Sequence, residues 1–251
     1  MNQAQFQKIL VDLNLTGKLN RNTPESNRQA IRELLALNTY WTFDARNVAA
    51  YKATYEEVAA MMAVALGMSD EQFASNEPPY INPERTVNGL IELRTRLDEH
   101  AKASKKILFA TAHPGSLQAF YLNLATEYQA RGGKVVRLEL PVEAPDRRWL
   151  DDVNGVIALS DEGNLMHSHN DNGFEVFVRD QKPDLVISDH GFAMGAINAE
   201  VPTVAIFDVD DPALPFMQLK YPDRVLAIPM NDNQTNTRSG LAASALWKVE
   251  L

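Results

Sequence analysis

The sequence predicts an α/β fold with a doubly wound, mostly parallel, Rossmann-like sheet that follows an N-terminal helical subdomain. From residue 105 onward, short runs of β-branched and other apolar residues alternate with helical patterns, which is typical of strand–helix–strand units. Before that point, apolar residues recur at three- and four-residue spacing, as in amphipathic helices. We therefore divide the chain into a helical subdomain, residues 1–104, and an α/β domain, residues 105–251, which carries the site.

Helix start and stop signals set the order of elements in the first 104 residues. An apolar stripe predicts a first helix that Gly17 ends, and the Thr23-Pro24 pair supplies the cap and first position of a second. Asp44 is expected to cap a long third helix that ends at Gly67, and a fourth helix runs from about 84 to 102. The methionines and aromatic residues of this half follow the helical period, so we assign them to the core.

In the second half, apolar runs predict the strands and the segments between them predict the helices. The runs 156–159 and 165–167 flank a turn at 160–164, which predicts a hairpin and hence an antiparallel element in a mixed sheet. The other strands are expected at 107–110, 135–138, 185–187, 203–207 and 225–228, and the helices at about 115–129, 173–181, 193–200, 213–219 and 237–247.

Composition and charge exclude several classes of protein. The net charge is −9 and there is no basic stripe, so we expect no nucleic-acid partner and no binding to anionic membranes. There are no cysteines, which excludes disulfides and thiolate chemistry. The first residues lack the basic start of a signal peptide, and no run of about 18 apolar residues predicts a membrane span. We therefore expect a cytoplasmic protein.

Four polar clusters each follow directly after an apolar run of the second half. They are His113–Ser116, Asp189–Gly191, Asp208–Pro212 and Asn231–Asn233. Ligands of an open α/β sheet bind at the carboxyl ends of its strands, so four such clusters predict one composite site. This site would be rich in carboxylates and poor in lysine.

The turn after the first strand is expected to bind substrate through His113, Gly115 and Ser116. Gly115 permits a tight turn, the Ser116 hydroxyl can cap the next helix, and a helix N-terminus attracts phosphate or carboxylate. The turn lacks the lysine and the additional glycines of a P-loop, so a plain strand-to-helix turn is the alternative.

Asp189, His190 and Gly191 offer an acid, an imidazole and a backbone that a ligand can approach closely. We expect Asp189 and His190 to be catalytic, with His190 as a general acid or base and Asp189 as a further metal ligand. Gly191 is expected to bind substrate. The alternative is that Asp189 caps a helix and His190 makes an ordinary hydrogen bond.

Asp208, Asp210 and Asp211 place three carboxylates within four residues, which repel one another unless a cation or a proton lies among them. We expect Asp208 and Asp211 to hold Mg²⁺, with Asp208 also catalytic, because Mg²⁺ prefers a few carboxylates with water and substrate oxygens. The alternative is a capping aspartate before Pro212. The run 206–210 also resembles the first motif of haloacid-dehalogenase-type phosphatases, but only about 40 residues follow it, too few for that family's later motifs.

Asn231 and Asn233 follow the last strand and, with Arg238, are expected to bind substrate. Arg238 would hold a phosphate with its forked guanidinium, and an Asx-rich turn is the alternative. His167 and His169 resemble a metal-binding pair, but an exposed position fits the pattern equally well.

Together these segments resemble a bacterial, largely actinobacterial, family of phosphatases over about residues 105–235. The resemblance rests on the Asp161–Asn164 turn, the Pro183–Ala193 stretch with its Asp-His-Gly-Phe-Ala run, the Asp208–Leu214 stretch and the final Asp232-Asn233 pair. The family pattern has asparagine where this chain has Asp210, so we expect no phosphoaspartyl role for that residue. The resemblance implies phosphatase activity.

We therefore expect a Mg²⁺-dependent hydrolase of a small phosphomonoester, with a small phosphorylated metabolite as its partner. Two alternatives stay open: a sugar-phosphate isomerase or lyase in which Asp189 and His190 move a proton, and a protein that binds a nucleotide or sugar phosphate without turnover. The helical half could also form a homodimer interface, with Tyr40 and Trp41 as candidate contacts.

Overall fold

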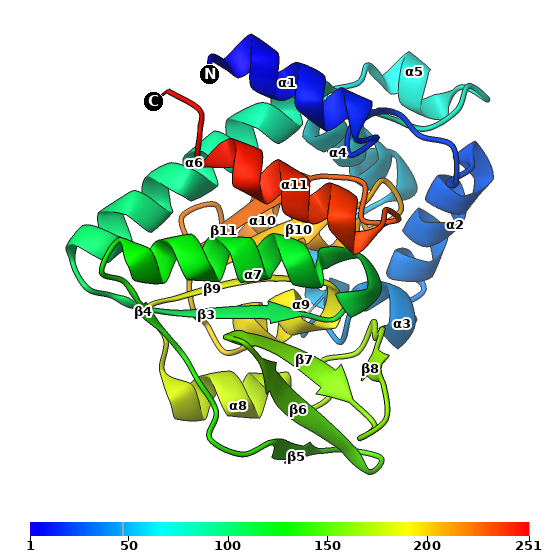
Figure 1. Ribbon diagram of the computed structural model, residues 1–251. Helices are drawn as coiled ribbons and strands as arrows, with labels where there is room; N and C mark the ends of the chain where they lie inside the picture. The colour runs from blue at the N-terminus through cyan, green and yellow to red at the C-terminus, as the bar shows by residue number, and fades with distance from the viewer. Residues whose placement is uncertain (47, 251) are drawn as a thin grey trace.

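The computed structural model describes residues 1–46 and 48–250. Its centre is a nine-stranded, mostly parallel sheet with helices on both faces, which confirms the predicted fold class (Figure 1). The strands lie in the order β11, β10, β9, β3, β7, β6 and β5, while β4 also pairs with β3 and β8 with β7. The pairs β5–β6, β6–β7 and β7–β8 are antiparallel, so the predicted hairpin is confirmed.

The strands and helices have the following bounds. The large sheet contains β3 (Lys106–Thr111), β4 (Lys134–Val135), β5 (Val142–Ala144), β6 (Arg148–Val153), β7 (Val156–Ser160), β8 (Leu165–Met166), β9 (Leu185–Asp189), β10 (Thr203–Phe207) and β11 (Val225–Pro229), and a separate ribbon contains β1 (Gly17–Lys18) and β2 (Tyr80–Ile81). The helices are α1 (Gln3–Asp12), α2 (Pro24–Leu35), α3 (Thr39–Thr42), the 3₁₀ helix η1 (Val48–Tyr51), α4 (Tyr55–Leu66), α5 (Asp70–Ala74), α6 (Pro83–Lys102), α7 (Pro114–Ala130), α8 (Phe174–Gln181), α9 (His190–Asn198), α10 (Ala213–Lys220) and α11 (Asn236–Leu246).

The central strands are uninterrupted apolar runs because both faces of the sheet are covered. In β3, Ile107 and Phe109 belong to a hydrophobic cluster with α1, α6, α7 and α11. Leu108 and Ala110 belong to another cluster, with α8 and α9. Successive side chains of a strand point to opposite faces, so a strand covered on both sides needs apolar residues at every position.

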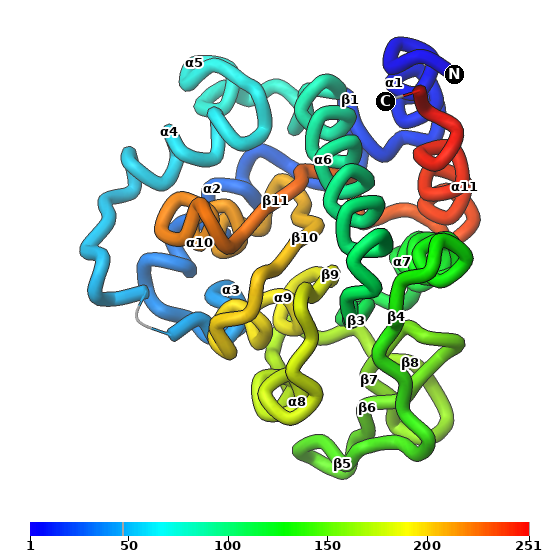
Figure 2. Tube along the Cα trace, turned by 90° about the vertical axis from the view of Figure 1, so that its left-hand side faces the viewer, coloured from blue at the N-terminus to red at the C-terminus, as the bar shows by residue number. Residues whose placement is uncertain are grey.

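The N-terminal helices lie on both faces of the sheet. α1 and α6 pack with α7 and α11 on one face, while α2 and α4 pack with α9 and α10 on the other. Figure 2 shows these two layers on opposite sides of the strands. The predicted division at residue 104 stays a prediction, but the first 104 residues share their hydrophobic clusters with the sheet. Among the described residues, no helix combines the length and apolar character needed to cross a membrane.

The prediction that Asp44 caps a long helix is wrong. Thr54 caps α4 through a reciprocal capping box with Glu57, and η1 is a separate turn before it. Asp44 instead accepts hydrogen bonds from the Asn170 side chain at 3.1 Å and from the Asp171 backbone N–H at 3.0 Å. The carboxylate thus ties the helical half to the loop after β8, a long-range contact that local sequence patterns do not reveal.

Two other local predictions need correction. The first helix ends at Asp12, so Gly17 does not end it and lies in β1 instead. The strand expected at 135–138 extends only over Lys134–Val135. The unpredicted strands β5 and β6 lie at the edge of the sheet, where partly exposed polar residues replace the apolar run of a central strand.

Thr86 fixes α6 to the end of β11 and provides a test of how the helical half is held. Its buried hydroxyl donates to the Pro229 carbonyl oxygen at 2.8 Å and lies 3.0 Å from Thr16 Oγ1. We predict that Thr86→Val lowers the free energy of unfolding by about 1–3 kcal/mol, because the buried carbonyl loses this donor. Chemical denaturation measures the change.

The matched control is Thr95→Val on the same helix, since the Thr95 hydroxyl donates to the Ile91 carbonyl oxygen within α6. An equal loss of stability in both variants would contradict the interpretation that Thr86 links the helix to the sheet.

Candidate active site

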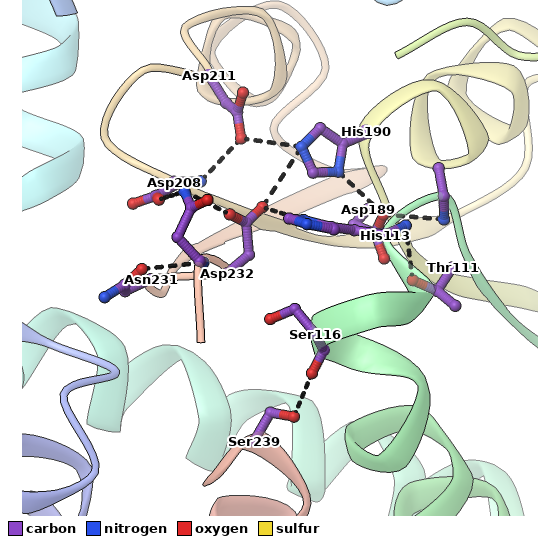
Figure 3. Close-up of polar contacts among 12 residues, drawn as sticks. Thr111, His113, Ser116, Asp189, His190, Asp208, Asp211, Asn231, Asp232 and Ser239 are labelled. Atoms are coloured by element: carbon purple, nitrogen blue, oxygen red, sulfur yellow. Dashed lines mark hydrogen bonds and ion pairs between the residues drawn. The ribbon is translucent and has the colours of Figure 1, made fainter. Parts of the chain in front are cut away.

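The carboxyl ends of four parallel strands lie side by side, and the loops after them form a buried polar cluster (Figure 3). His113 follows β3, Asp189 and His190 join β9 to α9, Asp208–Asp211 follows β10, and Asp232 follows β11. The structure therefore brings residues of all four sequence clusters together.

Asp189 and His190 form a hydrogen-bonded pair at the centre of this cluster. Asp189 Oδ1 lies 3.0 Å from His190 Nδ1 and accepts a hydrogen bond from the Ala112 backbone N–H at 2.9 Å. With a proton on Nδ1, His190 presents Nε2 to the carboxylates of the next two loops. Its φ of 43° lies in the left-handed region, which is costly for a residue other than glycine and is typical of functional sites.

Asp232 lies between two imidazoles. Its Oδ2 is 3.4 Å from His190 Nε2 and 3.5 Å from His113 Nδ1, and its side chain is buried. Burial favours the neutral acid, but the His113 and His190 imidazoles outweigh this effect and lower the pKa of Asp232. Asp232 is therefore a carboxylate at neutral pH.

The other aspartates show how much negative charge the fold has gathered. Burial raises the pKa of Asp211 to about 8 and that of Asp210 to about 6, and it raises the pKa of Asp208 well above its usual range. For His190, burial lowers the pKa, but Asp211 and the two other neighbouring carboxylates outweigh it and raise the pKa to about 10. In the described part of the chain Asp211 and Asp232 form ion pairs with histidines, and none of these aspartates pairs with lysine or arginine. Protons or a cation must balance their charge.

Three further histidines surround His190. The His113 ring stacks on the His167 ring, with centroids 4.2 Å apart, and the His169 centroid lies 4.9 Å from that of His190. Although part of the His167 side chain is exposed, desolvation of its ring and the neighbouring imidazoles lower its pKa to about 4, and the same causes lower the pKa of His169 to about 3. Both rings are therefore neutral at pH 7 and keep a free nitrogen lone pair. The sequence left their role open, and the structure puts them beside the cluster.

Two groups of side chains have the spacing that a metal ion requires. One contains His113, His167 and His190, and the other contains His190, Asp211 and Asp232; within each group the ligand atoms lie within 4.8 Å of one another. His190 Nε2 is 3.7 Å from Asp211 Oδ2, too far for a hydrogen bond. His113 Nδ1 and Asp232 Oδ2 are buried and have no hydrogen-bond partner among the described residues. These atoms lie 3.5 Å apart and lack a hydrogen-bond partner, as expected where an ion completes the site.

Asp208 and the asparagines have other contacts. Asp208 Oδ1 accepts from the Val209 N–H at 2.7 Å, and Oδ2 accepts from Asn233 Nδ2 at 2.9 Å. Asn231 donates to the Asn14 carbonyl oxygen at 2.8 Å and accepts from the Asn233 N–H at 3.0 Å. Asp208 and both asparagines thus support the loops that carry Asp211 and Asp232.

The predicted substrate-binding residues separate into two sets. Ser116 is buried near the cluster, but its hydroxyl makes no hydrogen bond to any described residue, so it does not cap α7 as expected (Figure 3). Gly115 has open space beside its backbone. Arg238, by contrast, is exposed and donates to Gln234 at 2.7 Å, so the structure does not bring it into the cluster.

Residues of the helical half that sequence reasoning did not assign to the site also line it. The Tyr40 ring stacks on His169 with centroids 3.8 Å apart, and the buried Phe43 ring meets the edge of His190 at 5.3 Å. Tyr40 was expected as a dimer contact, which stays a prediction. The nearness of α3 to the sheet edge is a tertiary contact, and no local pattern in the sequence indicates it.

Gly191 is needed for loop packing, and its role in substrate binding stays a prediction. A Cβ at this position would lie 2.2 Å from the Asn170 carbonyl oxygen and 2.6 Å from that of His169. We predict that Gly191→Ala lowers the free energy of unfolding by about 1–3 kcal/mol, because the backbone at residues 169 and 170 must move. Chemical denaturation measures this loss.

Gly115→Ala is the matched control, since a Cβ there meets nothing within 4 Å. This variant should be as stable as the wild type or slightly more stable, because alanine favours the helix. Equal stability of both alanine variants would contradict the packing assigned to Gly191.

Comparison with known proteins agrees with the sequence resemblance. A family model described as Phosphatase matches residues 1–239, and so includes the N-terminal helices as well as the sheet. Phosphatase SCO2771 from Streptomyces coelicolor is similar, with 27% identity over 189 residues, which are 73% of this chain and 71% of that protein. No solved structure matches the chain. The chain belongs to the Phosphatase family, which confirms the predicted kinship with bacterial phosphatases.

Proposed function

We propose that the protein is a metal-dependent phosphatase that hydrolyses a small phosphomonoester at the carboxyl edge of its sheet. Family membership supports phosphatase chemistry. The observation that carries the metal dependence is a pair of buried atoms without a hydrogen-bond partner among the described residues, His113 Nδ1 and Asp232 Oδ2, beside His190 Nε2. A phosphate dianion would be repelled by this acidic site unless a cation were present.

The residues that fit a divalent cation are His190, Asp211 and Asp232, joined by His113. A bound cation would supply Lewis acidity and a nucleophilic water at neutral pH. The sequence predicts Asp189, Asp208 and Asp211 as the ligands of Mg²⁺. Our proposal keeps Asp211 and replaces the other two with His190 and Asp232. Asp189 accepts from His190, and both oxygens of Asp208 already accept protein donors, so these two would orient the site.

The first turn of α7 is our candidate for the phosphate cradle. His113 occupies the N-cap position, and no side chain caps the helix. The positive end of a helix dipole attracts an anion, and the open space at Gly115 lets a phosphate approach the backbone. The buried, unpartnered Ser116 hydroxyl supplies a further donor beside this turn.

Asp210 is our candidate for proton transfer to the leaving oxygen. The sequence predicts His190 for this role, but both of its nitrogens face carboxylates. Asp210 is partly exposed, and burial among carboxylates raises its pKa to about 6. A carboxyl group with such a pKa can carry a proton near neutral pH and release it to a leaving group.

Phosphate release from a panel of small phosphate esters tests this proposal. Wild-type protein stripped with EDTA should be inactive and should recover turnover when a divalent cation is added. Asp232→Asn should lower kcat/KM by more than about 100-fold, beyond the roughly 10–100-fold typical of residues that only orient a metal ligand.

Asp12→Asn, which removes an exposed carboxylate paired with Lys8, is the control and should keep full activity. Turnover that is insensitive to EDTA would exclude metal dependence. If no ester releases phosphate, the phosphatase proposal fails and the isomerase or binding alternatives become the better accounts.

A further inference from the structure

We infer that this site selects a first-row divalent transition ion, from Mn²⁺ to Zn²⁺, over Mg²⁺. The inference deepens the proposed function and relies on it for biological meaning, but its test measures metal binding and needs no turnover. It rests on which atoms face one another at the sheet edge.

The donor set is rich in imidazole. Three of the five residues in the two candidate groups are histidines, His113, His167 and His190, and His190 belongs to both groups. Mg²⁺ demands oxygen ligands and keeps much of its bound water. Imidazole nitrogen is a good ligand for the later first-row ions, including Zn²⁺, and a weaker one for Mn²⁺. A mixed nitrogen and carboxylate site of this kind favours the transition ions.

Asp189 makes His190 a prepared ligand. The carboxylate accepts from His190 Nδ1 at 3.0 Å and is itself held by the Ala112 N–H at 2.9 Å. This arrangement holds a proton on Nδ1 and directs Nε2 at the candidate ligands, so that a bound cation would replace the proton on Nε2, as in the carboxylate–histidine pairs of transition-metal centres. The Phe43 ring packs against the imidazole and limits its rotation. Asp189 is therefore a positioning residue.

The carboxylate ligands are positioned in the same way. Asp211 Oδ2 accepts from the Asp208 backbone N–H at 3.0 Å, which fixes its direction. An all-carboxylate Mg²⁺ site would need Asp208 as a ligand. Its two oxygens instead accept hydrogen bonds from the Val209 N–H and the Asn233 side chain. Asp211 and Asp232 are the carboxylates whose oxygens group with His190, with ligand atoms within 4.8 Å of one another.

The experiment is a metal-binding measurement on untagged, full-length protein stripped of metal. Mn²⁺, Co²⁺, Zn²⁺ and Mg²⁺ are titrated one at a time, with calorimetry for affinity and visible absorption of Co²⁺ for ligand type and number. We expect each transition ion to bind at least about tenfold more tightly than Mg²⁺, with affinity increasing from Mn²⁺ through Co²⁺ to Zn²⁺. The Co²⁺ spectrum should show nitrogen ligation.

Variants assign the site. His113→Gln and Asp232→Asn should weaken Co²⁺ binding and change its spectrum, and Asp189→Asn should weaken it by about 10–100-fold without removing a ligand. His100→Gln is the matched control, because His100 lies on α6 and contacts the Arg96 carbonyl oxygen of its own helix. His167→Gln replaces an exposed residue and serves if a buried variant fails to fold.

Mg²⁺ affinity equal to that of Co²⁺ would overturn the inference, as would unchanged Co²⁺ binding in His113→Gln and His167→Gln. Tight Co²⁺ binding without hydrolysis of any ester would uphold the inference and reject the proposed function. If Mg²⁺ supported hydrolysis as well as Co²⁺ did, and bound with equal affinity, the proposed function would stand and the inference would be rejected.

Discussion

The hydrogen bond between Asp189 and His190 is the interaction on which the rest of the site depends. It joins the last residue of a central strand to the first residue of α9, and it directs His190 Nε2 at Asp211 and Asp232. The same carboxylate holds the Ala112 N–H just before the β3–α7 turn. One buried side chain thus positions the loops of two neighbouring strands. The left-handed backbone at His190 is a cost that this packing sustains.

The gathering of carboxylates is the second constraint. Asp208, Asp210, Asp211 and Asp232 lie close enough to affect one another's pKa, and Asp211 and Asp232 have histidines as ion-pair partners. Such a cluster opposes folding unless protons or a cation neutralise it. Stability and function are therefore linked here, because the negative charge that opposes folding is the charge that would hold a cation. A bound cation would in turn stabilise the folded protein by mass action.

Much of the fold could be predicted from the sequence because the central strands are covered on both faces. Every position of a run such as 204–207 is apolar, and the polar residues directly after it mark the edge where the site lies. Helix stop signals were also informative, as at Gly67, which ends α4 with a left-handed φ. The exposed edge strands β5 and β6 lack this uninterrupted pattern, and they were not predicted.

The assignment of roles within the site could not be predicted, because it depends on side-chain direction. Sequence spacing cannot show that Asp189 turns toward His190, or that Asp232 lies between two imidazoles. The contributions of Tyr40 and Phe43 depend on where α3 packs. Each ring contacts a histidine more than 100 residues away in the sequence, His169 for Tyr40 and His190 for Phe43. The contact between Gly191 and the loop at residue 170 is likewise a tertiary feature.

The most direct test of this account is anomalous diffraction from crystals of the full-length protein grown with Zn²⁺. The account predicts an ion within about 2.0–2.2 Å of both His190 Nε2 and an Asp232 oxygen, the usual zinc–ligand distances, with the Asp189–His190 hydrogen bond intact. An ion bound elsewhere, with His190 and Asp232 joined directly by a hydrogen bond, would contradict it.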